Sequence, residues 1–167
     1  MNTFRRFLCL IVLAATVAAC ASPSTSTQLN ESAEAEAAQE TLVRFFDQLN
    51  SGQYDQATEL YGGSYEVMIE QNLDLDAEDQ AALFQAACQI NGAQCLKVKS
   101  AVLQTGVEGN QFSFLVEFSN PDGSLFVLGP CCGGNETDSP PQSQFPFRVI
   151  KDASGKFTVL DPPVYAP

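Results

Sequence analysis

The hydrophobic pattern of this chain changes its period once, near the middle, and that change constrains the fold more than any other feature. Before Gly92, apolar side chains recur every three or four residues, as on one face of a helix. After Cys95 they recur every second residue, as on one face of a half-buried strand. Helices first and strands second predict an α+β domain with N-terminal helices and an antiparallel strand meander.

Three helical stretches are predicted in the first half. The first spans 42–49, the second spans 54–61, and a further turn or two is expected at 65–69. Asp76 begins the third, because its carboxylate is placed to accept backbone N–H groups of the first turn. An Asn-Gly pair at 91–92 ends that helix.

The second half predicts four to five strands joined by turns rich in Gly, Pro and Asx residues. The expected strands are 96–102, 112–119, 124–128, 145–151 and 156–160.

The N-terminus carries an export signal. Arg5 and Arg6 precede an uncharged stretch at 7–19, which is too short for a relaxed transmembrane helix. The stretch ends Val17-Ala18-Ala19-Cys20, which resembles the lipobox of bacterial lipoproteins, whose cysteine receives a diacylglycerol. The alternative is an ordinary Ala-x-Ala cleavage that leaves Cys20 as a spare thiol.

The lipobox resemblance implies a location and a domain plan. Residues 1–19 are the signal peptide, 20–40 a lipidated flexible tether of low hydrophobicity, and 41–167 a single α+β domain. Within the tether, the Ala and Glu run at 33–40 is compatible with a helix next to the domain. Cys20 anchors the chain to a membrane. Because Ala21-Ser22 follows without an acidic residue, the expected site is the outer membrane of a diderm bacterium or the outer face of a monoderm plasma membrane.

The charge balance excludes some partners and chemistries. The chain has 8 basic and 20 acidic residues and a net charge of −12, which becomes −14 when Arg5 and Arg6 leave with the signal peptide. Nucleic acid is not a partner, since phosphate binding needs clustered cations. The chain has no histidine, so Ser-His-Asp and Cys-His catalysis are excluded.

Four cysteines remain in the domain after Cys9 and Cys20 are set aside, and export favours their oxidation. The favoured pairing joins Cys88 and Cys95 each to one of Cys131 and Cys132, since adjacent cysteines bond only in a strained ring. The alternative joins Cys88 to Cys95 and Cys131 to Cys132. A four-thiolate zinc site does not match this spacing.

Residues 42–57, LVRFFDQLNSGQYDQA, resemble the opening of nuclear transport factor two-like (cystatin-like, SnoaL-like) domains, and the likeness extends loosely through the strand meander. The resemblance implies a curved, cone-like sheet around a helix, with a pocket at its open end. The residues expected to line that pocket are Phe112, Phe114, Phe118 and Tyr61.

Enzymes of that family pair an acid with a His, Tyr or Arg in the cone. The nearest equivalents here are Asp47 or Glu59 with Tyr54, Tyr61 or Tyr65. The acids are expected on solvated helix faces and the tyrosines are expected to pack with their hydroxyls at the surface, so no catalytic residue is assigned.

Together these features predict a lipid-anchored, extracytoplasmic, non-catalytic binding or accessory domain of the cell envelope. Its partner is a small apolar ligand or an envelope protein, and no cofactor or metal is expected, because helix capping explains the carboxylates at 74–79 that suggest calcium. The alternatives are a metal-independent enzyme that uses an acid and a tyrosine, and a purely structural envelope protein.

Overall fold

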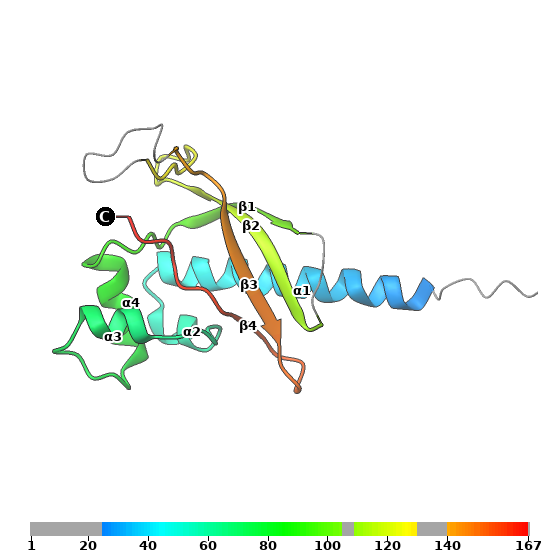
Figure 1. The fold of residues 1–167 in the computed structure, drawn as a ribbon, viewed down its shortest axis with the longest axis horizontal. Helices are drawn as coiled ribbons and strands as arrows, with labels where there is room; N and C mark the ends of the chain where they lie inside the picture. Colours follow the sequence, from blue (N-terminus) through cyan, green and yellow to red (C-terminus); the bar gives the residue numbers. More distant parts are fainter. Residues whose placement is uncertain (1–24, 105–108, 130–139, 167) are drawn as a thin grey trace, which may run out of the picture.

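The structure is a computed structural model that describes residues 25–104, 109–129 and 140–166, with side chains from residue 32 onward. Helices come first and strands second, as the change of period predicts (Figure 1). The elements are α1 (Thr25–Asn50), α2 (Tyr54–Thr58), α3 (Glu66–Gln71), α4 (Gln80–Gln89), β1 (Lys97–Leu103), β2 (Gln111–Ser119), β3 (Phe145–Lys151) and β4 (Phe157–Val159).

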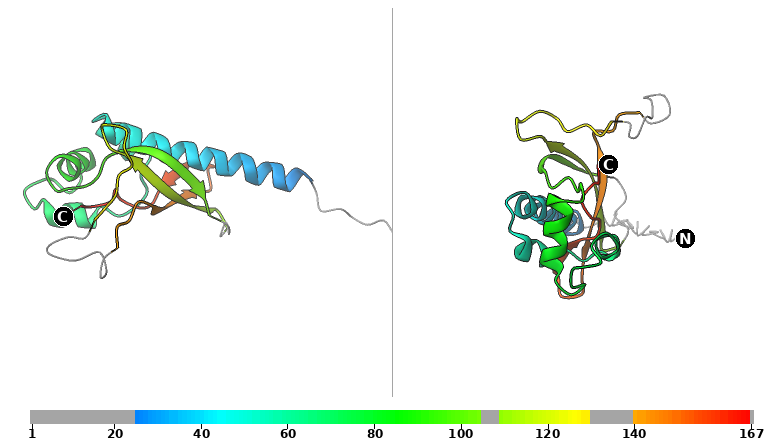
Figure 2. Two further views of the ribbon diagram at one scale, coloured as in Figure 1. Left: turned by 90° about the horizontal axis from the view of Figure 1, so that it is seen from above. Right: turned by 90° about the vertical axis from the view of Figure 1, so that its left-hand side faces the viewer.

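The four strands form one antiparallel sheet in the order β1-β2-β3-β4, which confirms the predicted α+β class and meander. Side chains of β2 alternate between buried and half-buried along its whole length, so one face of the sheet is covered and the other is partly open. Helix α1 contacts all four strands, and it crosses the covered face (Figures 1 and 2). The short helices α2, α3 and α4 gather at the C-terminal end of α1 (Figure 1).

The expected strand at 124–128 is wrong. This segment makes only isolated bridges, from Leu125 to Ser119 and from Leu128 to Gln142. The reason is that most of the β2 edge with which this segment would pair is already occupied. β3 pairs with β2 as far as Val116 on the edge opposite β1, so the returning chain has only the last residues of β2 to pair with.

Residues 25–40 belong to α1, so the predicted flexible tether is wrong for 25–32, whereas the helix considered at 33–40 is present; residues 20–24 lie outside the described part. Ala, Glu and Gln favour helix, and this stretch also packs against the body. Ala38 is fully buried in the core, the Gln39 side chain donates to the Ala101 carbonyl at 3.0 Å, and Glu34 pairs with Lys151 at 2.8 Å. Small alanine side chains thus form the apolar face of this part of α1, and a sequence pattern based on large apolar residues does not detect it.

Aromatic rings fill the space between α1 and the sheet. The Phe46 ring meets Phe118 and Phe147 edge-on, with ring centroids 4.8 and 5.0 Å apart. Phe45, from the same helix, contacts Phe84 of α4 at 5.7 Å. All five side chains are buried, so one core joins the sheet to the helical end.

The single disulfide in the described residues joins Cys88 to Cys95, whose Cα atoms are 5.6 Å apart. The favoured pairing with Cys131 and Cys132 is therefore wrong, and those two residues lie outside the described part of the chain. The intervening loop closes because Gly92 adopts a φ of +82°, and an added Cβ there would lie 2.5 Å from the Ala166 carbonyl oxygen.

No helix among the described residues has the length and apolar character needed to span a bilayer. No group of three or more His, Cys, Asp or Glu side chains within them is arranged to hold a metal ion.

Candidate functional site

The four residues expected to line a cone pocket lie in the packed core. Phe112, Phe114, Phe118 and Tyr61 are all buried, and Tyr61 stacks on Phe45 with centroids 5.7 Å apart. None of the three hollows described below is lined by these four side chains.

The acid and tyrosine pairs considered for catalysis are not brought together by any hydrogen bond among the described residues. Asp47 and Glu59 are exposed, as the solvated-face interpretation predicts. Tyr61 donates its hydroxyl to the Ser64 carbonyl at 2.9 Å, while the Tyr54 hydroxyl accepts from Gln89 at 3.2 Å.

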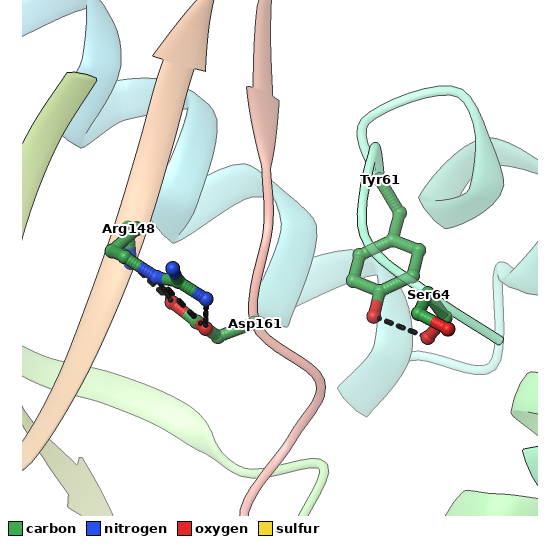
Figure 3. Close-up of polar contacts among 4 residues, drawn as sticks. All are labelled: Tyr61, Ser64, Arg148 and Asp161. Carbon is green, nitrogen blue, oxygen red and sulfur yellow. Dashed lines mark hydrogen bonds and ion pairs between the residues drawn. The ribbon is translucent and has the colours of Figure 1, made fainter. Parts of the chain in front are cut away.

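A different acid, Asp161, lies near Tyr61. Its carboxylate is held by Arg148 of β3, whose backbone N–H donates at 2.7 Å and whose Nε lies 3.1 Å from both carboxylate oxygens (Figure 3). Burial, followed by the nearby Tyr65 and Asp161, raises the pKa of Tyr61 well above its ordinary value. The Tyr61 hydroxyl therefore stays protonated near neutral pH, and the Arg148–Asp161 pair fastens the segment after β4 to β3.

Two of the hollows are formed by turns. One, of about 350 Å³, lies where α1 ends beside the 119–123 turn, and its lining includes Asn50, Leu96 and Lys97. The other, of about 600 Å³, is bordered by the 152–155 turn, Glu34 and Lys151, and it is broadly open to solvent. More than half of the lining of the second hollow is polar. The lining of the first is mostly apolar, but it includes no exposed Leu, Ile, Val, Met or aromatic side chain.

The third hollow lies between α4 and the loop that follows α3, and we call it the α3–α4 groove. Its volume is about 210 Å³. Its lining residues are Asn72, Asp74, Leu75, Ala82, Gln85, Ala86, Gln89 and Ile90.

One large apolar side chain of the groove lining is exposed, and a second is its neighbour in the sequence. Ile90 lines the groove and is 78% exposed, and Leu73, which lies in the chain between the lining residues Asn72 and Asp74, is 86% exposed. No other large apolar side chain in the described residues exceeds 58%. Contiguous exposed apolar surface marks interaction sites, so these two side chains make the groove the candidate contact surface of the described residues.

Hydrogen bonds hold both walls of the groove in place. The buried Asn72 donates to the Met68 carbonyl at 2.7 Å and accepts from the Asn91 side chain at 3.0 Å, which ties the end of α3 to the end of α4. Asp79 caps α4 by accepting from the Ala82 N–H at 3.0 Å. The Cys88–Cys95 disulfide secures the other end of α4.

Two of the carboxylates that suggested calcium accept backbone N–H groups, but the predicted start of the helix at Asp76 is wrong, since α4 begins at Gln80. Asp76 accepts from the Glu78 N–H at 3.0 Å, and Asp79 is the cap of α4. Asp74 and Glu78 are exposed as well, and Asp74 is the one of these four acids that lines the groove.

Comparison of the chain with protein-family profiles, with curated protein sequences and with solved structures finds no match. The lipobox and the nuclear transport factor two-like resemblance therefore stay predictions that rest on the residues quoted for them.

Proposed function

We propose that this chain is a lipid-anchored, extracytoplasmic accessory domain of the cell envelope that binds a second protein through its α3–α4 groove. The anchor is Cys20, and the proposal takes it from the sequence alone, since that residue lies outside the described part. The folded domain that follows the anchor in the chain presents the binding surface.

One observation carries the binding half of the proposal: Leu73 and Ile90 are 86% and 78% exposed beside a hollow whose walls are fixed. The hollow is smaller than the roughly 300 to 1,000 Å³ of small-molecule sites. A protein partner fits it better, because protein interfaces bury single large side chains as anchors in small pockets. The observation thus favours the protein partner over the small apolar ligand.

Site-specific photo-crosslinking in living cells of the host tests the binding half. A benzophenone amino acid replaces Leu73 or Ile90 in the full chain, and the controls place it at the exposed Val102 or Val127, which lie outside the groove. The expected result is a discrete adduct of one size from positions 73 and 90 only. Absence of an adduct there, or the same adduct from all four positions, contradicts the proposal.

Metabolic labelling with an alkyne fatty acid tests the anchor. The wild-type chain takes up label, and Cys20→Ser abolishes it and leaves the signal peptide uncleaved. Label retained by Cys20→Ser would show that the anchor is elsewhere.

A further inference from the structure

We infer that the α3–α4 groove receives a cationic amphipathic helix of the partner, with one large apolar side chain in the hollow and Lys or Arg residues against the surrounding carboxylates. This inference rests on the proposed function, because it names the chemistry of the partner at the same surface. Three observations carry it: the size of the hollow, the charge around it, and the charge of the rest of the molecule.

The size of the hollow sets how much apolar surface the partner inserts. A space of about 210 Å³, whose lining includes Ala82 and Ala86, accommodates one large side chain such as Leu, Met or Phe. Leu73 and Ile90 supply further apolar contact next to it. A helix with apolar residues at i, i+3, i+4 and i+7 matches this arrangement, since one residue enters the hollow while its neighbours on the same face meet the exposed side chains.

The charge of the segment that forms the groove sets the sign of the partner. From residue 45 to residue 92 the sequence has nine acidic residues and neither Lys nor Arg. They are Asp47, Asp55, Glu59, Glu66, Glu70, Asp74, Asp76, Glu78 and Asp79. All nine are exposed, and six lie between Glu66 and Asp79, in α3 and the loop that forms one wall.

The remaining charges reinforce this asymmetry. Of the six basic residues after the signal peptide, Arg44 is on α1 and the other five come after residue 93, on the strands and their turns. The segment 45–92 therefore contributes no Lys or Arg that could neutralise its carboxylates. A cationic partner that comes within about 10 Å of these carboxylates at 0.1 M salt would be attracted to them, whereas nucleic acid or an anionic membrane surface would be repelled.

Binding of defined peptides to the full-length protein tests the inference. The full-length protein, after processing by its host, is reconstituted in phosphatidylcholine nanodiscs. Empty nanodiscs give the reference signal. The probe is a fluorescein-labelled 18-residue peptide of Leu and Lys with helical periodicity. Its controls are the same composition in scrambled order and a Leu and Glu counterpart.

Two pairs of variants separate the apolar and charged contributions. Leu73→Ser with Ile90→Ser is expected to weaken binding of the Leu and Lys helix at least tenfold. Asp74→Asn with Glu78→Gln is expected to weaken it three- to fivefold at 50 mM salt and by less than twofold at 300 mM, where charges are screened. These two acids are chosen because Asp76 and Asp79 cap backbone groups. The matched controls, Val102→Ser and Glu36→Gln with Glu40→Gln, replace exposed residues outside the groove and are expected to change nothing.

The outcomes distinguish the two proposals. Equal binding of the scrambled or Leu and Glu peptide, no binding at all, or wild-type binding by the groove variants overturns the cationic helix. If adducts at positions 73 and 90 persist in cells despite such a result, the binding function stands and only the chemistry of the partner is wrong. If the peptide binds as expected but no cellular adduct forms, the proposed function fails instead.

Discussion

The body of the molecule and its helical end are stabilised in different ways. In the body, α1 and the sheet bury interlocking aromatic rings, and Phe46, Phe118 and Phe147 are almost entirely removed from water. In the helical end, three helices of five, six and ten residues add Leu83 and Phe84 to the same core and are also held by one side-chain cap, an asparagine pair and a disulfide, while Leu73 and Ile90 remain exposed. This end therefore uses polar and covalent links in addition to apolar packing, and it keeps two large apolar side chains in contact with water.

The largest effect should come from the aromatic core of the body. Phe46→Ala removes a ring that contacts both β2 and β3, and we expect a loss of about 3 to 5 kcal/mol in the free energy of unfolding. Urea unfolding followed by circular dichroism measures it. A loss below about 1 kcal/mol would mean that the core does not distinguish the body from the helical end.

The disulfide should matter next, and mainly at the helical end. Cys88→Ser with Cys95→Ser opens a short loop, and loop entropy predicts a loss of about 2 to 3 kcal/mol. Hydrogen exchange should show faster exchange in α4 and little change in β2. Faster exchange in both regions to the same extent would contradict a separate fastening of the helical end.

The cap of α4 should contribute about 1 kcal/mol. Asp79→Ala removes the acceptor for the Ala82 N–H, and Asp74→Ala is the matched control, since Asp74 is exposed and its carboxylate caps no helix. Thermal unfolding of the two variants should differ by that amount. Identical melting curves would show that capping does not hold this end.

The smallest effect concerns a polar turn of the body. Hydrogen bonds from Ser154, followed by the Lys156 N–H, lower the pKa of Asp152 below its ordinary value. Its contribution to stability is therefore present above the ordinary Asp pKa of about 3.9 and is lost as pH falls through the lowered value. An NMR titration should give a midpoint below 3.9 that Ser154→Ala raises. A midpoint at or above 3.9 would contradict the account of this turn.

The sequence predicts the body better than the helical end because strict alternation of apolar and polar residues indicates a strand and fixes which side chains face the core. The expected strand at 145–151 matches β3, and 112–119 matches β2 to within one residue. Strand 124–128 failed because pairing depends on which edge is already occupied, and a single segment does not reveal that. The start of α1 at 25–32 was missed because its small and polar residues have the composition of a weakly hydrophobic linker.

The groove was missed for a related reason. Ile90 continues the apolar spacing of Leu83 and Ala87, so periodicity alone places it inside. The helix ends at Gln89, and Ile90 leaves the helical conformation and turns its side chain to solvent. Similarly, the Cys88–Cys95 bond depends on a loop conformation that Gly92 permits, and cysteine spacing left that pairing open. Apolar exposure depends on where a helix stops, to within one residue.

The central claim is that the exposed apolar side chains of the helical end serve binding and not stability. The most direct measurement combines Leu73→Ser with Ile90→Ser in the full chain, with a photo-crosslinker at the groove residue Gln85. The account predicts that the adduct from position 85 disappears while the free energy of unfolding stays within about 0.5 kcal/mol of the unsubstituted chain. An adduct that persists, or a loss of stability above about 1 kcal/mol, would contradict it.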